Sequence, residues 1–348
     1  MKCDYCFYRD LADKRVVGDY GIMNRHTCEQ VIQKALSYAT DSCSFIFQGG
    51  EPTLAGADFY RYFVRTVRDH APADLPIAYS IQTNGYRLSD DMLAVLKENG
   101  FLVGLSLDGN HVCHDAHRRD TAGCETFSNV ARTARRLSSR HIDFNILTVV
   151  TPTLVHHVQQ MFTFFVNQGY RYLQFISCLP PLGEDESAYV VTDEEYGLFL
   201  MQLFDLWFDE LEKGNAISIR YFDNLIALLR TGKAEACGLQ GRCSTQYVVE
   251  SDGSVYPCDF YVMDRFSLGN LTECDIYAID RSRKRLGFIE NSRNQTNGCR
   301  LCPYRLLCGG GCRRERRQDG RYRYCQATQK FLAYALPRLL AIAEWINP

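Results

Sequence analysis

Residues 43–52 read CSFIFQGGEP, a short apolar run that stops at two glycines and a carboxylate. Four further apolar runs follow, and longer segments with apolar residues three and four apart separate them. They are IAYSIQTNG at 77–85, FLVGLSLDG at 101–109, FNILTVV at 144–150 and YLQFISCL at 172–179. Short apolar runs predict buried strands, and the intervening spacing predicts helices. Repeated βα units predict an α/β fold with a parallel sheet and helices outside it.

Three of the predicted strands end in polar or glycine clusters: QGGEP, QTNG and SLDG. In α/β barrels and open α/β sheets, functional groups lie at the carboxyl ends of the strands. The sequence therefore predicts a site at the top of a barrel. We count five strands, and the CDYC segment at 3–6 precedes the first of them.

Composition narrows the classes of protein that this chain can represent. Its 348 residues suffice for one large and one small domain. The 41 acidic and 39 basic residues give a net charge of −2, which argues against a non-specific nucleic-acid binder. No apolar run reaches the length of about eighteen residues that a membrane span needs, and no secretion signal precedes the first element, so we expect a cytoplasmic protein without membrane contact. Sixteen cysteines in a reducing compartment indicate metal ligation rather than disulfides.

The chain divides by composition into four segments. We expect a barrel at 1–215, a helical bridge at 216–236, a small cysteine-rich domain at 237–330 and a C-terminal helix at 331–348. One hairpin signal lies in the third segment, where YVVESDGSVYPC places an SDG turn between two alternating runs.

Eight cysteines gather in the third segment with the spacing C-x5-C-x14-C, then C-x2-C-x5-C-x3-C, then a last cysteine. They are Cys237, Cys243, Cys258, Cys299, Cys302, Cys308, Cys312 and Cys325. Eight thiolates make two four-ligand sites, which hold either zinc or iron–sulfur clusters. The spacing alone leaves both alternatives open.

The N-terminal MKCDYCFYRD, taken with QGGEP at 48–52, resembles the radical S-adenosylmethionine superfamily, whose CxxxCxxC loop binds a 4Fe-4S cluster. The later cysteines resemble that superfamily's SPASM extension, which carries two further 4Fe-4S clusters. FQGGEPTLAG, SIQTNG, SIRYFDNL, VVESDGSVYPCDFY and LCGGGCRR are similar to the anaerobic sulfatase-maturating enzymes. The resemblance spans nearly the whole chain and implies a partial (β/α)6 barrel followed by the SPASM domain and a C-terminal helix.

The sequence departs from the family at the first loop cysteine, which would stand two positions before Met1, in a sequence of the form C-N-M-K-C-D-Y-C. We therefore expect that Met1 is an internal methionine, and that a first barrel strand and a first cluster ligand lie upstream. A two-cysteine variant with another third ligand is the alternative.

The resemblance implies oxidation of a cysteine or serine of a sulfatase, within a CxPxR or SxPxR motif, to formylglycine. Asp259 matches the general base, and Tyr8 is a candidate orienting residue. The expected S-adenosylmethionine contacts are Tyr5, Gln48, Gly49, Gly50, Glu51, Gln82, Ser106 and Leu179.

The same resemblance assigns the metal ligands. Cys3 and Cys6 belong to the cofactor-binding cluster. The first auxiliary cluster is expected at Cys237, Cys243, Cys258 and Cys312, and the second at Cys299, Cys302, Cys308 and Cys325. An electron donor such as ferredoxin or flavodoxin is the second expected partner, and the chain is expected to act as a monomer.

The remaining cysteines are interpreted as buried small side chains or bystanders: Cys28, Cys43, Cys113, Cys124, Cys178 and Cys274. HVCHDAHRRD at 111–120 has metal-like histidines, but we expect a polar loop over the site, with Arg118 near the cofactor. Two other functions remain in competition: a radical enzyme that crosslinks a ribosomally made peptide, and a zinc-stabilised or inactive chain.

Overall fold

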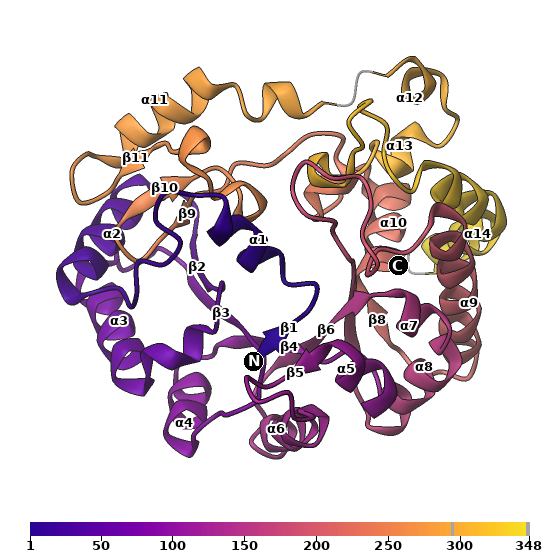
Figure 1. The fold of residues 1–348 in the computed structure, drawn as a ribbon, viewed down its shortest axis with the longest axis horizontal. Coiled ribbons are helices and arrows are strands. Elements are labelled where there is room, and N and C mark those ends of the chain that lie inside the picture. The colour runs from indigo at the N-terminus through magenta and orange to yellow at the C-terminus, as the bar shows by residue number, and fades with distance from the viewer. Residues whose placement is uncertain (294–295, 346–348) are drawn as a thin grey trace.

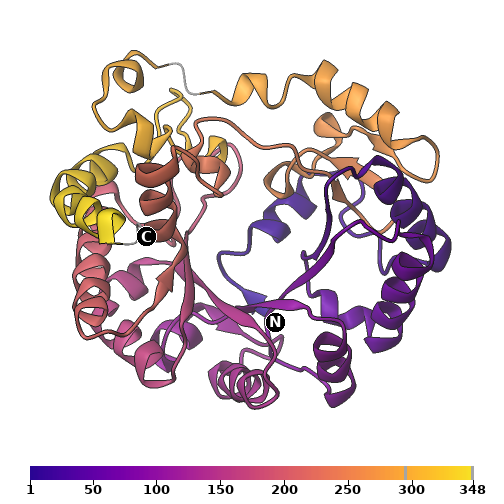
Figure 2. The same cartoon turned by 180° about the vertical axis from the view of Figure 1, so that it is seen from behind.

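The computed structural model describes residues 1–293 and 296–345. At its centre a parallel sheet runs in the order β2-β3-β4-β6-β7-β8 and curves, with helices on its outside (Figures 1 and 2). Its strands are β2 (Cys43–Phe47), β3 (Ile77–Thr83), β4 (Leu102–Ser106), β6 (Phe144–Val150), β7 (Tyr172–Ser177) and β8 (Ser218–Ile219). The first five confirm the predicted strands, and the partial barrel is confirmed with them.

Amphipathic helices cover the outer face of this sheet because each buries one apolar side against it. They are α2 (Arg25–Tyr38), α3 (Ala57–His70), α4 (Asp90–Glu98), α6 (Phe127–Ser139), α7 (Pro152–Val155), α8 (Val158–Asn167), α9 (Asp193–Glu212) and α10 (Arg220–Thr231). The 3-10 turn η1 (Pro52–Ala55) precedes α3. Local sequence sets several helix starts, since Ser89 accepts a hydrogen bond from Met92 N and Thr192 forms a capping box with Glu195.

The sixth strand, β8, was not among the predicted elements. It pairs in parallel with β7, and α10 follows it directly, so the sheet extends into the segment predicted as a helical bridge. Two residues are too few to show a strand period. Helix α9 helps to fix the position of β8, because Trp207 Nε1 donates a hydrogen bond to Ile217 O, just before the strand, at 2.7 Å.

The prediction of a polar loop at 111–120 was wrong. This stretch forms α5 (His111–His117), which the side chain of Asn110 caps, and then β5 (Arg118–Arg119). β5 pairs antiparallel with β1 (Lys2–Cys3), and α1 (Phe7–Asp13) follows β1. The N-terminal cysteine segment is thus tied to the segment after β4.

The cysteine-rich region begins with η2 (Cys237–Leu239) and a three-stranded antiparallel sheet in the order β11-β10-β9. Its strands are β9 (Val248–Val249), β10 (Ser254–Tyr256) and β11 (Gly269–Asn270), and β9 with β10 confirms the predicted hairpin. The other elements are η3 (Asp259–Tyr261), η4 (Asp264–Phe266), α11 (Ile276–Leu286), η5 (Glu290–Ser292), α12 (Asn297–Leu301), α13 (Arg305–Cys308) and η6 (Arg313–Glu315). The C-terminal helix α14 (Cys325–Trp345) begins earlier than predicted, and 346–348 of that prediction lie outside the described residues.

This region spans the barrel from one side to the other (Figure 1). On one side Val31 of α2 packs with Val255 and Ile279. On the other side Tyr304 and Leu307 pack against the main core. The two ends of the cysteine-rich region are therefore anchored to different helices of the barrel.

A buried polar joint links the last long strand of the barrel to the cysteine-rich region. Ser177, at the end of β7, donates a hydrogen bond from Oγ to Glu315 Oε1. Arg314 Nη2 donates to Pro180 O at 2.6 Å. Burial raises the pKa of Glu315, so the serine hydroxyl supports a carboxylate that lacks water.

None of the helices in the described ranges combines the length and apolar character needed to cross a lipid bilayer.

Replacing Ser177 by Ala is expected to destabilise the fold, because it leaves a buried acceptor of Glu315 without its donor. The expected loss is about 1–3 kcal/mol of unfolding free energy, measured by anaerobic chemical denaturation. Ser139→Ala is the matched control, since Ser139 bonds only to Arg136 O at an exposed helix end. Equal stability of the two variants would contradict a structural role for the joint.

Candidate functional site

The N-terminal cysteine segment lies beside the residues that follow β4. Cys3 pairs through its backbone with Arg118, and Cys6 directly precedes α1. Burial raises the pKa of the Cys3 thiol, while the positive charge of Arg118 opposes that rise. Both thiols predicted as cluster ligands thus lie in one short segment beside a cation.

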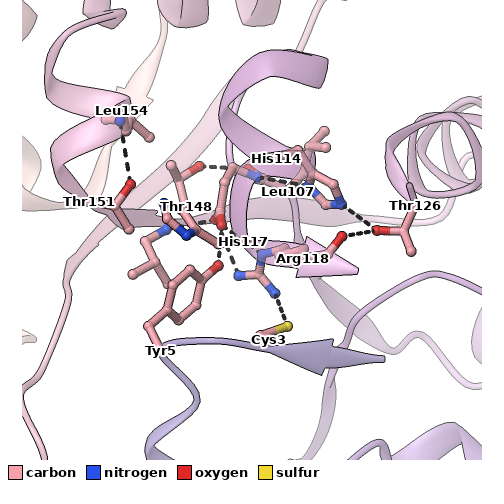
Figure 3. A network of polar contacts seen from close by, with 12 residues as sticks. Cys3, Tyr5, Leu107, His114, His117, Arg118, Thr126, Thr148, Thr151 and Leu154 are labelled. Carbon is pink, nitrogen blue, oxygen red and sulfur yellow. Dashed lines mark hydrogen bonds and ion pairs between the residues drawn. The ribbon is translucent and has the colours of Figure 1, made fainter. Parts of the chain in front are cut away.

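A buried ion pair holds this segment in place (Figure 3). Arg118 binds Asp108 through Nε to Oδ2 at 2.7 Å and through Nη2 to Oδ1 at 3.2 Å. Tyr5 donates a hydrogen bond from its hydroxyl to the same carboxylate, and the guanidinium of Arg118 lies 5.4 Å from the centre of the Tyr5 ring. Arg118 Nη1 also lies 3.9 Å from Cys3 Sγ. Arg118 therefore contacts both the tyrosine and a cysteine of the predicted cofactor loop.

The charge of Asp108 is stabilised despite its burial. Burial alone would raise the pKa of this carboxyl group, but Arg118 and the hydrogen bond from Tyr5 outweigh it, so the pKa lies below the ordinary value. The backbone amide of Val149 on β6 donates to Asp108 Oδ1 at 2.9 Å. The pair is thus ionised and fully hydrogen-bonded, as a buried pair must be.

The histidines of α5 do not form a metal site. His114 is fully buried, accepts a hydrogen bond from Asp108 N at Nδ1 (3.3 Å) and contacts Thr126 Oγ1 through Nε2 (3.2 Å). Burial and the charge of Arg118 lower the pKa of His114 to about 4. It is therefore a neutral structural residue near pH 7.

The segment after β2 makes a sharp turn at the top of the sheet. Gly49 and Gly50 have φ angles of 86° and 54°, which a residue with a side chain rarely adopts. Glu51 Oε1 accepts hydrogen bonds from Thr53 N at 3.1 Å and Thr83 Oγ1 at 2.8 Å, and Oε2 accepts one from Asn84 N at 2.8 Å. The carboxylate predicted as a cofactor contact thus joins the ends of β2 and β3, and the glycine backbone beside it is the part that a ligand can approach.

Two other predicted cofactor residues share one face of the sheet. Gln82 pairs with Gly104 across β3 and β4, so Gln82 and Ser106 project to the same side. Gln82 is exposed and Ser106 is half-buried. Leu179, also half-buried, follows β7 next to Pro180 of the polar joint. The predicted contacts therefore come from the ends of successive strands.

The candidate base is delivered from the cysteine-rich region. Asp259 follows Cys258, and Gln48 Nε2 donates a hydrogen bond to Asp259 Oδ2 at 3.3 Å. Phe260 N donates to Asp259 Oδ1 at 3.1 Å. Burial raises the pKa of Asp259. The charge of Asp259 also adds to the effect of burial in raising the pKa of the neighbouring Tyr8. The structure thus brings together Gln48, Tyr8 and Asp259 from three distant parts of the sequence.

The structure brings together the first group of four cysteines. Cys237, Cys243 and Cys312 line one small pocket, together with Arg242, Arg313 and Arg316. Cys258 is close enough to Cys312 for their charges to interact. Gly238 approaches this group so closely that an added Cβ would lie 3.3 Å from Cys312 N.

The second group is assembled by the short helices α12 and α13 and the start of α14. Burial, with the nearby Cys325, Cys299 and Cys302, raises the pKa of Cys308 to about 11. The pKa of Cys325 is raised mainly by burial, and again by Cys299 and Cys302. The four thiols are therefore mutual neighbours, in the grouping that the resemblance implied.

Both groups fit an iron–sulfur cluster better than a single ion. Among residues 1–293 and 296–345, no three histidine, cysteine or carboxylate side chains are placed to hold one metal ion. A 4Fe-4S cluster spreads four cysteines over its four iron atoms and accepts wider spacing. Burial raises the pKa values of Cys258 and Cys312, so a cationic cluster would be needed to hold them as thiolates.

The remaining cysteines take no part in these groups. Cys28, Cys113 and Cys178 are buried, Cys43 and Cys274 are half-buried, and Cys124 is exposed. The sequence interpretation gave no role to Asp108, Ser177 or Glu315. The SLDG strand end was a signal for Asp108, whereas nothing local pointed to Ser177 or Glu315.

The comparisons with known proteins agree with this geometry. A family model described as the radical SAM superfamily matches residues 1–165, and one described as an iron-sulfur cluster-binding domain matches residues 237–303. A cysteine-type anaerobic sulfatase-maturating enzyme of Clostridium perfringens is 42% identical over 354 residues, covering 100% of this chain and 96% of that protein.

Two further matches extend the comparison. A serine-type anaerobic sulfatase-maturating enzyme of Klebsiella pneumoniae is 29% identical, covering 100% of this chain and 87% of that protein. A solved structure described as native anSMEcpe with bound AdoMet and Kp18Cys peptide superposes with a TM-score of 0.94 at 41% identity. That superposition covers 99% of this chain and 96% of the other.

Replacing Asp108 by Ala is expected to destabilise the fold strongly, because Arg118 is left buried without its partner. Breaking a buried pair from one side costs about 3–5 kcal/mol, measured as unfolding free energy. Asp91→Ala is the control, since its pair with Arg61 is exposed and solvent screens it. A small and equal loss in both variants would refute the structural role of the Asp108 pair.

His114 is expected to make stability depend on pH. Its folded pKa of about 4 lies below its ordinary value of 6.5, so the unfolded chain binds the proton more readily between these values. Its stabilising contribution is therefore complete above pH 6.5 and decreases as the pH falls, by about 2 kcal/mol at pH 5. His114→Gln should flatten the slope of unfolding free energy between about pH 6.5 and 5. An unchanged slope would show that His114 does not titrate in this way.

Proposed function

The chain belongs to the family of anaerobic sulfatase-maturating enzymes, and we propose that it acts on a cysteine-type sulfatase. It is a radical S-adenosylmethionine oxidoreductase that converts a sulfatase side chain to formylglycine. The preference for cysteine is supported by 42% identity to a cysteine-type enzyme against 29% to a serine-type enzyme. A similar solved structure holds AdoMet together with a peptide named Kp18Cys, which supports a polypeptide substrate.

The cofactor site is proposed at the top of the barrel. Cys3 and Cys6 would hold the cofactor-binding cluster, which with S-adenosylmethionine supplies the radical that takes a hydrogen atom from the substrate Cβ. Tyr5 is oriented for the cofactor by its bond to Asp108, and Arg118 fixes both. The glycine backbone at 49–50 permits close approach. The proposed contacts are Tyr5, Gln48, Gly49, Gly50, Glu51, Gln82, Ser106 and Leu179.

The observation that carries the proposal is the placement of Asp259 against Gln48. A carboxylate whose pKa is raised by burial is a stronger base than one in water, and the reaction must remove a proton from the substrate. Gln48 holds one oxygen of Asp259, and the phenol of Tyr8 lies near the same group. Asp259 is therefore proposed as the general base, with Tyr8 as its positioning residue.

The cysteine-rich region is proposed to carry away the electron that the substrate releases. The ligands proposed are Cys237, Cys243, Cys258 and Cys312 for one cluster and Cys299, Cys302, Cys308 and Cys325 for the other. A one-electron carrier such as ferredoxin or flavodoxin is proposed as the exchange partner. The high content of cysteine supports a reducing, cytoplasmic setting.

The test uses the cluster-loaded enzyme, S-adenosylmethionine, a chemical reductant and a peptide with a CxPxR motif, under anaerobic conditions. Mass spectrometry should detect formylglycine in the peptide. Asp259→Asn should lower the rate of formylglycine formation by about 10²–10⁴, the usual contribution of a general base. The cleavage of S-adenosylmethionine to 5′-deoxyadenosine should persist in this variant, because it precedes proton removal.

Asp264→Asn is the matched control, since Asp264 lies in the same segment but is exposed and bonds to Val16 N. Its rate should stay within about twofold of the parent, as expected for a surface change. Iron content should be equal in all three proteins. Absence of formylglycine with the parent enzyme would reject the function, whereas full activity of Asp259→Asn would reject only the role of Asp259.

A further inference from the structure

Two leucines beside the second cysteine group are almost fully exposed. Leu301, the last residue of α12, is 87% exposed, and Leu306 of α13 is 85% exposed. The opposite side of α13 faces inward, because Leu307 packs against the main core. The outward position of Leu306 is therefore a fixed consequence of the helix orientation. Neighbouring exposed apolar side chains of this kind mark interaction surfaces.

Exposed arginines flank these leucines along the chain, Arg300 before Leu301 and Arg305 before Leu306. Residues 296–330 contain nine arginine and lysine residues, of which Arg314 and Arg323 are buried, and two acidic ones, although the whole chain has a net charge of −2. Of the two acids, Glu315 accepts the hydrogen bond from Ser177, and Asp319 pairs with Arg321. Arg300 and Arg305 are exposed, and neither has an ion pair or side-chain hydrogen bond among the described residues.

We propose that Arg300, Leu301, Arg305 and Leu306, here called the α12–α13 surface, dock an acidic protein that carries a single electron. This inference rests on the proposed function and names the place where the electron carrier binds. An apolar centre flanked by unpaired cations matches a partner with an apolar spot inside an acidic rim. The guanidinium groups would steer that partner and set its orientation, while the leucines supply the buried contact.

The α12–α13 surface lies where a docked carrier could exchange an electron with the second cysteine group. The surface lies on the same two short helices that carry Cys299 and Cys308, so a docked carrier comes close to the second cysteine group. In Figure 1 these helices lie at the outer rim, whereas α1, which contacts η3 through Phe7 and Phe260, lies near the middle. A partner at the rim therefore leaves the approach to Asp259 open. The step is balanced: the substrate radical loses one electron and one proton, the oxidised carrier gains the electron, and Asp259 takes the proton and passes it to the solvent.

The experiment measures binding of an acidic flavodoxin to the cluster-loaded enzyme by calorimetry at low and moderate salt. The double variant Arg300→Glu/Arg305→Glu should weaken binding by at least about tenfold and should reduce its salt dependence. Leu301→Ser/Leu306→Ser should weaken binding about as much while keeping the salt dependence, because its charges are unchanged.

The matched control is Arg68→Glu/Arg135→Glu, which reverses two exposed charges on α3 and α6, away from the α12–α13 surface (Figure 1). It should change the dissociation constant by less than about twofold, because long-range charge effects are screened. Iron content and formylglycine formation with a chemical reductant should be the same in the parent and all three variants. These readouts separate a failed docking surface from a failed function.

Several outcomes would overturn the proposal. Binding of flavodoxin that is unaffected by the arginine and leucine variants, or no binding to the parent, rejects the surface while formylglycine formation still supports the function. A dimer that the variants convert to a monomer would assign the surface to a second copy of the chain. Weaker binding of a sulfatase to the same variants, with flavodoxin unaffected, would assign it to the substrate protein.

Discussion

The buried pair between Asp108 and Arg118 is the interaction on which the upper end of the barrel depends. It joins the end of β4 to β5, and through Tyr5 and Cys3 it holds the N-terminal segment. The regular elements of that segment are short, since β1 has two residues and α1 seven, and Leu11 of α1 also packs with Tyr261 and Phe288 of the cysteine-rich region. A buried ion pair is weak evidence for net stability, but it penalises any arrangement that separates the partners. Its value here is positional, since a cofactor loop must be held in one geometry to act.

Directional contacts also set how the cysteine-rich region sits on the barrel. Apolar clusters attach it to α2 on one side and to the main core on the other, but apolar contact is not directional. Hydrogen bonds supply the direction: Gln48 to Asp259 at one point, Ser177 to Glu315 and Arg314 to Pro180 at another. Because these hydrogen bonds lie at two separate places, the cysteine-rich region can neither slide nor rotate on the barrel. The proposed base is therefore located by the barrel that it serves, although another part of the chain supplies it.

The features that the sequence revealed were those with a local pattern. The five longer strands show continuous apolar runs, the hairpin at 247–258 shows its turn, and the cysteines show their spacing. β8 was missed because two residues carry no period, and α5 was taken for a loop because its histidines and charges hid a short capped helix. Local sequence patterns could not predict the contacts of Arg118 with Cys3 or of Glu315 with Ser177. Cys3 lies 115 residues from Arg118, and Ser177 lies 138 residues from Glu315. Fold class follows from periodic local signals, whereas long-range polar pairing depends on the final packing.

The two cysteine groups are interleaved along the chain. Cys312 of the first group lies between Cys308 and Cys325 of the second, so the two ligand sets cannot be cut apart at any single point of the backbone. During synthesis on the ribosome, the first set is complete only once Cys312 has emerged, and the second only once Cys325 has emerged. A chain that stops between Cys312 and Cys325 therefore carries every cysteine of the first group but lacks one of the second, so only the first centre could be completed.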